Sequence, residues 1–284
     1  MTKKSPSFLQ FDSPWFFDPG TVRVPSPPKD LSSEEIARRL KYGELNQPYI
    51  METSSERRLH FTHDAVQTVM RLDEPDALVS AYTRKMMAFL LFNPNPKKIV
   101  MVGLGGGSLA KFCYRNLPRT RISVAEIDDQ VIALREEFHV PADDERFRIV
   151  CDDGARYILR SSERIDVVVV DAFDPVGLAA TLADTAFYEQ ANRRLSPNGL
   201  LVMNFSGEVK RYALHLKRIR AAFDGSALLV PVVTDDNLLL FAFKRRLDSL
   251  TSAKYESRAQ RLQARLALEF PRYLRLISAG HALN

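Results

Sequence analysis

A glycine-rich turn between an apolar run and a helical segment constrains the fold of this chain more than any other feature. The order of residues is Ile99-Val100-Met101-Val102, then Gly103-Leu104-Gly105-Gly106-Gly107, then a helical pattern from Ser108. Glycine lets the backbone turn sharply and approach a ligand closely, and the first turn of a helix leaves N–H groups free to bind it. Glu126 follows Gly107 by 19 residues at the end of a second apolar run, where a carboxylate can bind ribose hydroxyls. Together these features predict a nucleotide-binding α/β fold.

Apolar runs and helical patterns alternate from Lys97 onward. Strands are expected at 98–103, 121–126, 147–151, 165–171 and 200–205, and helices at 108–116, 129–138, 154–160, 183–195 and 208–222. This alternation predicts a parallel sheet with helices on both faces. Two further runs, 227–233 and 238–244, are separated by four polar residues and predict an antiparallel hairpin at the edge of the sheet. The expected fold class is α/β, a doubly wound, methyltransferase-type Rossmann-like sheet with an antiparallel edge hairpin.

The chain is expected to have four parts. Residues 1–47 are rich in Pro and Ser at first and then carry a capped helix signal at Ser32, and we interpret them as an N-terminal extension. Residues 48–96 predict a small antiparallel β lobe followed by a connecting helix at 77–92. Residues 97–245 form the doubly wound domain, and residues 246–284 are expected to form a basic C-terminal helix.

The composition is that of a globular protein, with 45% apolar and 26% charged residues. The longest apolar stretches, 165–172 and 227–233, have the length of strands and are too short to span a bilayer. No apolar segment follows Lys3 and Lys4, so no signal peptide is expected. The two cysteines, Cys113 and Cys151, have no second cysteine nearby, so neither a disulfide framework nor a metal site is expected, and a cytoplasmic location fits.

The net charge of +5 is concentrated in the tail, because residues 244–284 carry a net +6 and the rest of the chain a net −1. One helical face of the tail is apolar, and it comprises Tyr255, Ala259, Leu262, Leu266 and Phe270. Another face carries Arg258, Arg261 and Arg265. We interpret this segment as a terminal helix that packs on the body and exposes a solvated basic face. Neither nucleic acid nor a membrane is expected as a partner.

Acidic residues follow three strands of the predicted sheet. In open α/β sheets, ligands bind beyond the carboxyl ends of the strands. Glu126 ends the second strand, Asp153 follows the third, and Asp171 and Asp174 follow the fourth. A helix cap or a surface acid is the alternative interpretation of any one of them, and it is the one we prefer for Asp152. The shared position of the other four predicts a ligand site at this edge.

From about residue 49 to residue 244 the sequence resembles the spermidine synthase family, the polyamine aminopropyltransferases. The matching segments are 95–98 before the first strand, the glycine turn, 125–128, 153–154, 171–177, 187–188 and 195–199. The most specific of them is the DxxDPVG element that runs from Asp171 to Gly177. The resemblance implies that residues 97–245 bind an adenosyl sulfonium, and it implies a homodimer.

The resemblance also implies roles for individual residues. Glu126 would bind the ribose, Asp153 the adenine amino group, and Gln67 the nucleoside. The turn glycines that would hold the donor are Gly103, Gly105, Gly106 and Gly107. Asp171 would orient and deprotonate the attacking amine, with Asp174 and Tyr82 as the other catalytic residues. The co-substrate would be decarboxylated S-adenosylmethionine or S-adenosylmethionine, the partner a small-molecule amine, and no metal is expected.

The chemistry explains the need for two carboxylates. An alkylammonium has a pKa of about 10.4, so at neutral pH it must lose a proton to a base before it can attack carbon. A sulfonium donor and a cationic acceptor also repel each other, and carboxylates between them offset that repulsion. The reaction is then displacement at a carbon next to sulfur, with positioning providing much of the acceleration.

Three departures from the family pattern keep alternatives open. Residues 82–84 read Tyr-Thr-Arg, where the family usually has Tyr-His-Glu or a similar sequence. Gly106 stands where the family usually has an aspartate that holds the amine of the donor, and its absence could admit intact S-adenosylmethionine. The last hairpin lacks the aromatic residue common in the family, although Asp235 and Asp236 there could face a cation. The leading prediction is an aminopropyltransferase with a putrescine-like acceptor. The alternatives are an S-adenosylmethionine-dependent methyltransferase and a non-catalytic nucleoside- or partner-binding protein.

Overall fold

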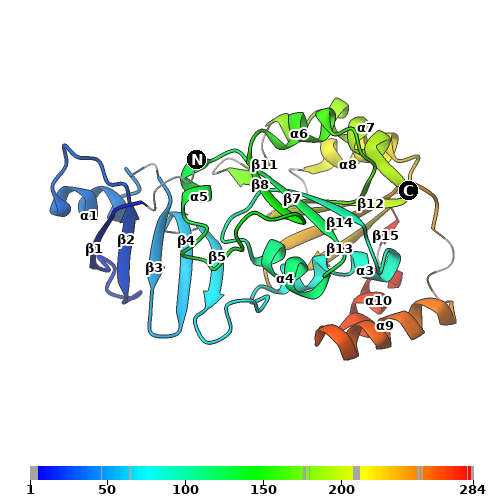
Figure 1. Cartoon of the computed structure of the whole chain (residues 1–284), viewed down its shortest axis with the longest axis horizontal. Helices are drawn as coiled ribbons and strands as arrows, with labels where there is room; N and C mark the ends of the chain where they lie inside the picture. The colour runs from blue at the N-terminus through cyan, green and yellow to red at the C-terminus, as the bar shows by residue number, and fades with distance from the viewer. Residues whose placement is uncertain are drawn as a thin grey trace. The chain divides into compact units, whose positions relative to one another are not determined.

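The computed structural model describes residues 6–45, 47–63, 65–174, 177–178, 180–206, 212–247, 250, 252–279 and 281–282. Two compact units make up the chain (Figure 1). Unit 1 comprises residues 1–79, 104–112 and 128–142, and unit 2 comprises residues 80–103, 113–127 and 143–284.

Unit 1 is built on an antiparallel sheet of five strands in the order β1-β2-β3-β4-β5. The strands are β1 (Phe8–Asp12), β2 (Thr21–Pro25), β3 (Tyr49–Glu52), β4 (Glu56–Thr62) and β5 (Ala65–Arg71). Helix α1 (Ser33–Lys41) begins where the sequence predicts it, because the Ser32 hydroxyl accepts a hydrogen bond from the N–H of Glu35. Its buried residues Ile36 and Leu40 belong to a core that also includes Trp15, Val22 and Tyr49.

The N-terminal segment differs from the extension expected for residues 1–47. Strand β1 pairs with β2, and β2 pairs with β3, so these residues supply two strands of the same sheet. In β2, Val22 and Val24 are buried while Arg23 between them is half-buried. Prolines on either side limit β1 and β2 to five residues each. Pairing with neighbouring strands, which the local sequence does not reveal, makes such short runs stable.

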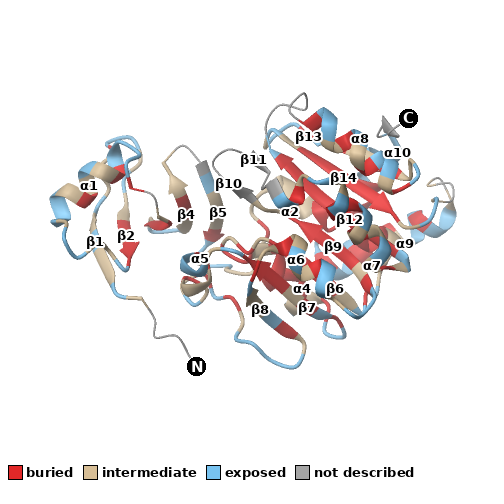
Figure 2. Ribbon diagram, turned by 90° about the horizontal axis from the view of Figure 1, so that it is seen from above, coloured by how far each residue is buried: buried red, intermediate tan, exposed pale blue. Residues whose placement is uncertain are grey.

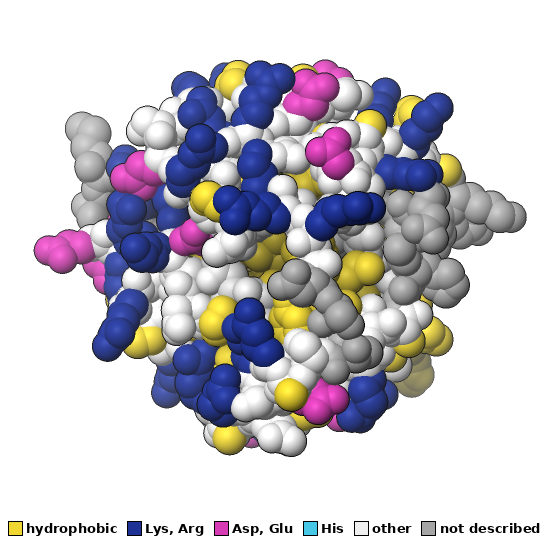
Figure 3. All heavy atoms as spheres, turned by 90° about the vertical axis from the view of Figure 1, so that its right-hand side faces the viewer, with side chains coloured by type: hydrophobic (Ala, Val, Ile, Leu, Met, Phe, Trp, Pro, Cys, Tyr) yellow, Lys and Arg dark blue, Asp and Glu magenta, His cyan; other side chains and the backbone are white. Residues whose placement is uncertain are grey.

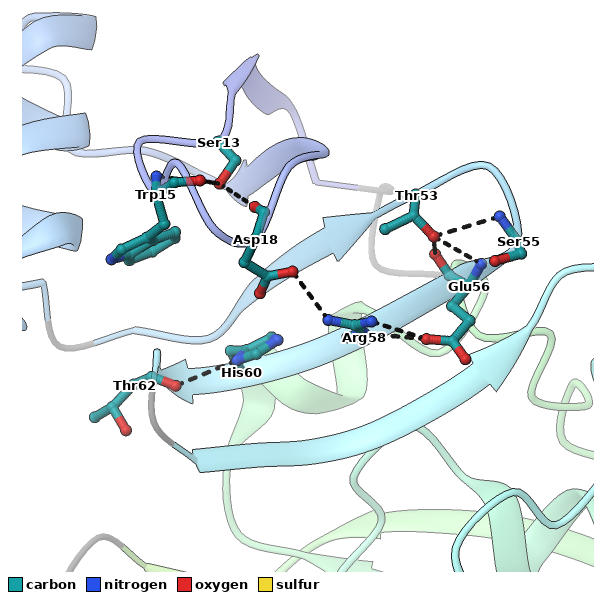
Figure 4. A network of polar contacts seen from close by, with 9 residues as sticks. All are labelled: Ser13, Trp15, Asp18, Thr53, Ser55, Glu56, Arg58, His60 and Thr62. Atoms are coloured by element: carbon teal, nitrogen blue, oxygen red, sulfur yellow. Dashed lines mark hydrogen bonds and ion pairs between the residues drawn. The ribbon is translucent and has the colours of Figure 1, made fainter.

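Polar contacts attach the loop before β2 to β4 (Figure 4). Arg58 on β4 forms ion pairs with Asp18 at 3.2 Å and with Glu56 at 3.0 Å. Within the loop, the Ser13 hydroxyl donates to the carbonyl of Asp18 at 2.7 Å. This loop also carries Trp15, which stacks on His63 with ring centroids 4.0 Å apart. Both charged and aromatic contacts therefore hold the N-terminal strands to the rest of the sheet.

Unit 2 is built on an eight-stranded sheet in the order β15-β13-β14-β12-β9-β6-β7-β8. The strands are β6 (Lys98–Val102), β7 (Arg121–Glu126), β8 (Phe147–Cys151), β9 (Ile165–Val170), β12 (Leu195–Ser206), β13 (Ala227–Val232), β14 (Asn237–Phe243) and β15 (His281–Ala282). Strands β8, β7, β6, β9 and β12 run parallel, and β14 pairs antiparallel with β12 and β13. The prediction of a parallel sheet with an antiparallel edge hairpin is confirmed.

Helices cover both faces of this sheet, as a doubly wound fold requires. Figure 1 shows α6, α7 and α8 on one side and α3, α9 and α10 on the other. The helices of the chain beyond α1 are α2 (Ala81–Met86), α3 (Phe89–Phe92), α4 (Ser108–Asn116), α5 (Asp129–Ala133), α6 (Gly154–Arg160), α7 (Thr185–Arg194), α8 (Ala213–Ala222), α9 (Ala253–Leu266) and α10 (Phe270–Ala279). A 3-10 turn covers Ala180–Leu182, and two short strands, β10 (Phe173–Asp174) and β11 (Gly177–Leu178), pair with each other. The central strands of the large sheet are almost wholly buried (Figure 2).

Three helical predictions differ in detail from the structure. The helix expected at 77–92 is divided into α2 and α3, and the one expected at 129–138 ends its regular turns at Ala133. The helix expected from 208 begins at Ala213, and residues 207–211 lie outside the described part of the chain. In each case the apolar spacing is correct, but periodicity alone does not locate the ends of a helix.

The basic tail forms two helices instead of one. Helix α9 ends at Leu266, and Ala267 takes the left-handed conformation with φ +53° before α10 begins. The predicted apolar face is confirmed, because Tyr255, Ala259, Leu262, Leu266 and Phe270 are all buried. Arg261 and Arg265 are exposed, and Figure 3 shows Lys and Arg side chains (dark blue) spread over the side on which these helices lie. Among the described residues, no helix is both long and apolar enough to cross a membrane.

Candidate active site

Asp171 lies directly after β9, at the carboxyl end of the parallel strands of unit 2. Its side chain accepts a hydrogen bond at each oxygen. The amide Nδ2 of Asn204 donates to Oδ1 at 2.9 Å, and the Tyr82 hydroxyl donates to Oδ2 at 3.2 Å. Asp171 and Tyr82 are half-buried, whereas Asn204, in the middle of the apolar strand β12, is only 2% exposed. The structure therefore brings together two of the three predicted catalytic residues, Asp171 and Tyr82.

The backbone around Asp171 is fixed by the ends of the neighbouring strands. The N–H of Asp171 donates to the carbonyl of Val102 at 3.0 Å, and the N–H of Gly103 donates to that of Ala125 at 2.9 Å. Gly103 has φ +91°, and a Cβ on it would lie 2.2 Å from the carbonyl oxygen of Asp171. Only glycine fits at this position, because a side chain would collide with the backbone that carries the carboxylate.

Burial and hydrogen bonding shift the pKa of Asp171 in opposite directions. Burial raises the pKa of Asp171 above its ordinary value, while the hydrogen bonds from Asn204 and Tyr82 lower it. Burial, together with the neighbouring Asp171 carboxylate, raises the pKa of Tyr82 well above its ordinary value. Tyr82 consequently stays protonated and remains a donor. Asp171 is a carboxylate with increased basicity, which is the property that a general base needs.

Two further residues support this arrangement: Asp235, which the sequence analysis named only as an acid that could face a cation, and Asn237, which it did not assign to the site. Asp235, in the turn between β13 and β14, accepts a hydrogen bond from the N–H of Tyr82 at 2.8 Å. Asn237, the first residue of β14, donates from Nδ2 to Oδ1 of Asn204 at 2.9 Å. The polar Asn204 within the apolar run Leu200 to Phe205 was a signal that could have been noticed. Asn237 follows two aspartates in a predicted turn and gave no such signal.

The acids predicted to bind the nucleoside follow β7 and β8 in unit 2. Glu126 ends β7 and is 8% exposed. Asp153 is the N-cap of α6, since its Oδ1 accepts from the N–H of Arg156 at 2.8 Å, and its Oδ2 accepts from the Thr181 hydroxyl at 2.7 Å. Each carboxylate oxygen can accept more than one hydrogen bond, so the capping role leaves capacity for a ligand.

Asp152 has the structural role that the sequence analysis preferred for it. It is buried and forms an ion pair with Arg156 at 2.8 Å and a second with Arg160. Both arginines lie on α6, so the carboxylate fixes that helix to the end of β8.

The remaining turn glycines lie in unit 1. Gly105 and Gly107 have φ of +52° and +70°. The N–H of Gly106 donates to the Thr68 hydroxyl at 2.9 Å, and a Cβ at position 106 would lie 2.6 Å from Thr68 Cγ2 and 2.9 Å from Phe138 Cδ1. The position at which the family usually carries an aspartate is therefore closed to any side chain unless Thr68 and Phe138 move. Gln67, which precedes Thr68 in β5, is half-buried.

The predictions for Asp174, for a metal ion and for the two cysteines remain to be compared with the described residues. The description of Asp174 is confined to its backbone in β10, so its predicted place beside Asp171 stays a prediction. Within the described residues, no group of three or more His, Cys, Asp or Glu is arranged to hold a metal ion. Cys113 and Cys151 are free thiols.

Comparison with known proteins identifies the family. The spermine/spermidine synthase domain model matches residues 79–224. A polyamine aminopropyltransferase of Chromobacterium violaceum is 37% identical over 242 residues, which cover 82% of this chain and 92% of that protein. The chain belongs to the spermine/spermidine synthase family. The predicted resemblance is thereby confirmed.

Solved structures show that the fold is that of this family as well. A probable spermidine synthase from Corynebacterium glutamicum superposes with a TM-score of 0.62 at 20% identity, covering 76% of this chain and 84% of that one. A spermidine synthase in complex with the transition-state analogue AdoDATO superposes with a TM-score of 0.52 at 22% identity, covering 69% and 73%. Asp171, Tyr82 and Asn204 lie within residues 79–224, the segment that the family model matches.

Proposed function

We propose that this protein transfers an aminopropyl group from decarboxylated S-adenosylmethionine to a small-molecule amine such as a diamine. The observation that carries this proposal is the carboxylate of Asp171, which stands at the carboxyl end of β9 with a neutral donor on each oxygen and with its basicity raised by burial. The name of the 37% identical relative, polyamine aminopropyltransferase, supports the same reaction.

In the proposed mechanism, Asp171 takes a proton from the ammonium group of the acceptor. The free amine nitrogen then attacks the methylene carbon bonded to the sulfonium of the donor. A C–N bond forms, the C–S bond breaks, and the sulfur leaves as a neutral thioether while the positive charge moves to nitrogen. Tyr82 and Asn204 hold the carboxylate in place, so that orientation and proton transfer together lower the barrier.

We assign the donor to the residues that the family resemblance implies. Glu126 would bind the ribose hydroxyls and Asp153 the adenine amino group, since both are carboxylates after parallel strands. Gly103, Gly105, Gly106, Gly107 and Gln67 keep their predicted roles in donor binding, and Asp174 its predicted role beside Asp171. A spermidine synthase of the same fold binds AdoDATO, which supports decarboxylated S-adenosylmethionine as the co-substrate.

The test is direct. The purified protein is incubated with decarboxylated S-adenosylmethionine and putrescine, and the aminopropylated product is measured by mass spectrometry. Intact S-adenosylmethionine in place of the decarboxylated donor, and a monoamine in place of the diamine, are the matched comparisons. We expect product only with the decarboxylated donor and more of it with the diamine. Methyl transfer from intact S-adenosylmethionine, or no product with any amine, would contradict the proposal.

Two expectations from the sequence accompany this function. The family resemblance implies a homodimer, which size-exclusion chromatography with light scattering would test. The absence of a cysteine framework in the sequence favours a cytoplasmic location, which fractionation of cells would test.

A further inference from the structure

Two asparagine side chains extend the polar contacts of Asp171 into the sheet. Asn204 Nδ2 donates to Asp171, and Asn237 Nδ2 donates to Oδ1 of Asn204, both at 2.9 Å. A carboxylate can only accept hydrogen bonds, so it requires the NH2 group of Asn204 to face it. The carbonyl of Asn204 must then face Asn237, which in turn must present its own NH2 group. The three side chains form a chain in which each amide has one permitted orientation.

Register explains why these residues meet. Strands β12 and β14 are antiparallel neighbours with Asn204 opposite Leu239 and Ser206 opposite Asn237, so Asn237 lies two residues along the ladder from Asn204. Asn204 is 2% exposed among apolar neighbours, where an amide that turned away from its partners would lose hydrogen bonds it cannot replace with water. The buried position of Asn204 thus makes its orientation depend on Asn237.

We propose that Asn237 is a positioning residue for the reaction, which holds the amide of Asn204 with its NH2 group toward Asp171 and so keeps the carboxylate oriented and ionised for the amine. This inference rests on the proposed function and adds to it a residue that does not itself contact Asp171. Among the described residues, the groups that bear on Asp171 are Asn204 from β12 and Tyr82 from α2, and Asp235 from the turn before β14 acts on Tyr82.

Two substitutions separate hydrogen bonding from shape. Asn237→Leu removes the donor to Asn204, and we expect kcat/KM to fall about three- to tenfold, the size of one lost hydrogen bond. Asn237→Asp has almost the same shape as the parent residue but can no longer donate when ionised. Asn204 would then turn its NH2 group toward residue 237 and its carbonyl toward Asp171, so we expect a larger loss than in Asn237→Leu.

The pH profile gives a readout that a merely structural role would not move. A carboxylate that loses a donor becomes a stronger base, so its pKa rises and it is protonated at a higher pH. In both Asn237 variants we expect the acidic limb of the kcat/KM profile to shift to higher pH. Asn237→Gln, which keeps the NH2 donor, should restore part of the activity and of the profile. Thr234→Ala, a change at an exposed residue of the turn between β13 and β14, should leave both unchanged.

A double-mutant cycle tests whether Asn237 acts through Asn204. We expect Asn204→Leu to lower kcat/KM about 10- to 100-fold, because a hydrogen bond to a charged group is lost. Adding Asn237→Leu to Asn204→Leu should then cause no further loss. Additive losses, or an unchanged acidic limb in both Asn237 variants, would overturn the inference. If Asn204→Leu does not fold, the inference is tested by the pH profiles of the Asn237 variants alone, because Asn237 is only half-buried and its substitution disturbs the core less.

The failure of this inference can be told from the failure of the proposed function. If the parent protein makes no aminopropylated product with any amine, the proposed function is wrong. If the parent is active and Asn237→Asp has the same kcat/KM and acidic limb as the parent, only the role of Asn237 is wrong.

Discussion

Asp171 in unit 2 and Lys111 in unit 1 are both ionisable groups whose charge is disfavoured by burial, yet their surroundings differ. Asp171 is half-buried at a strand end and accepts from a tyrosine and an asparagine. Lys111, on α4, is 2% exposed, and its Nζ donates to the carbonyls of Pro75 and Phe138, both at 2.7 Å, and to the sulfur of Met70 at 3.2 Å.

The difference favours a structural role for Lys111 and the proposed reactive role for Asp171. The ammonium of Lys111 has three donors and three partners, so nothing remains for a ligand, and the bonds tie together segments 27 to 41 residues apart in sequence. Each oxygen of Asp171 accepts one hydrogen bond and can accept another. Unused hydrogen-bonding capacity at a half-buried group, more than burial itself, is what supports the proposed role of Asp171.

The largest expected effect that would sharpen this comparison is that of Asp171→Asn on catalysis. An amide cannot take the proton of the amine, so kcat/KM should fall by about 10²- to 10⁴-fold. Stability should not fall, because the amide can still accept from Asn204 and donate to the Tyr82 oxygen. Steady-state kinetics and thermal unfolding measure the two quantities. Turnover close to that of the parent would show that Asp171 is not the base.

Lys111→Met is the matched variant in the other region. We expect the free energy of unfolding to fall by about 1–3 kcal/mol, because the carbonyls of Pro75 and Phe138 lose their buried donor. The kcat/KM at a temperature at which the variant is folded should stay close to that of the parent. A variant with parental stability and reduced catalysis would reverse the distinction between the two groups.

The contribution of Lys111 to the free energy of unfolding should depend on pH. Burial lowers the pKa of Lys111 from 10.5 to about 8, so between pH 8 and 10.5 the unfolded state binds more protons than the folded state. Stability from this group should therefore rise with pH across that window, by up to about 3 kcal/mol. Denaturant unfolding of the parent and of Lys111→Met across this range isolates the contribution as their difference. A difference that does not change with pH would show that the Lys111 ammonium is not destabilised by burial.

Much of unit 2 was predictable from the sequence. The runs at β6 and β9 are short and apolar, as strands buried on both faces of a parallel sheet must be. The acids at the ends of β7, β8 and β9 predict a ligand site at this edge. Asp171 and Tyr82, which are 89 residues apart in the chain, were placed together by family resemblance, since no local pattern connects them.

The contacts that the sequence did not reveal are those made by pairing between distant strands. Asn237 reaches Asn204 only because β14 pairs with β12 in one register. In unit 1, β1 and β2 are too short to predict from alternation, and their place in the sheet depends on pairing with β3. Gly106 was noted for the acid it lacks, whereas the structure shows that Thr68 and Phe138 occupy the space.

A loss of stability of similar size to that of Lys111→Met is expected from a substitution in the glycine turn, just before α4. Gly106→Ala would bring a Cβ to 2.6 Å from Thr68 Cγ2 and 2.9 Å from Phe138 Cδ1, so the free energy of unfolding should fall by about 1–3 kcal/mol. Thr68→Ser removes Cγ2 but keeps the hydroxyl that accepts from the N–H of residue 106. The double variant should therefore recover part of the loss, as measured by denaturant unfolding. Equal stability of Gly106→Ala and the parent would mean that the turn yields without cost.

The smallest effect concerns the support of Tyr82. Asp235 accepts from the N–H of Tyr82 in the first turn of α2, and the Ser80 side chain makes no capping hydrogen bond, so the carboxylate of Asp235 satisfies an amide that the helix leaves free. Asp235→Ala should lower the free energy of unfolding by about 1 kcal/mol, as the loss of a helix cap does. Asp235→Asn keeps an oxygen acceptor and should lose less. Because Tyr82 donates to Asp171, Asp235→Ala should also lower kcat. Thr234→Ala, at an exposed residue of the same turn, should not. Equal kcat values for the two alanine variants would show that the cap does not affect catalysis.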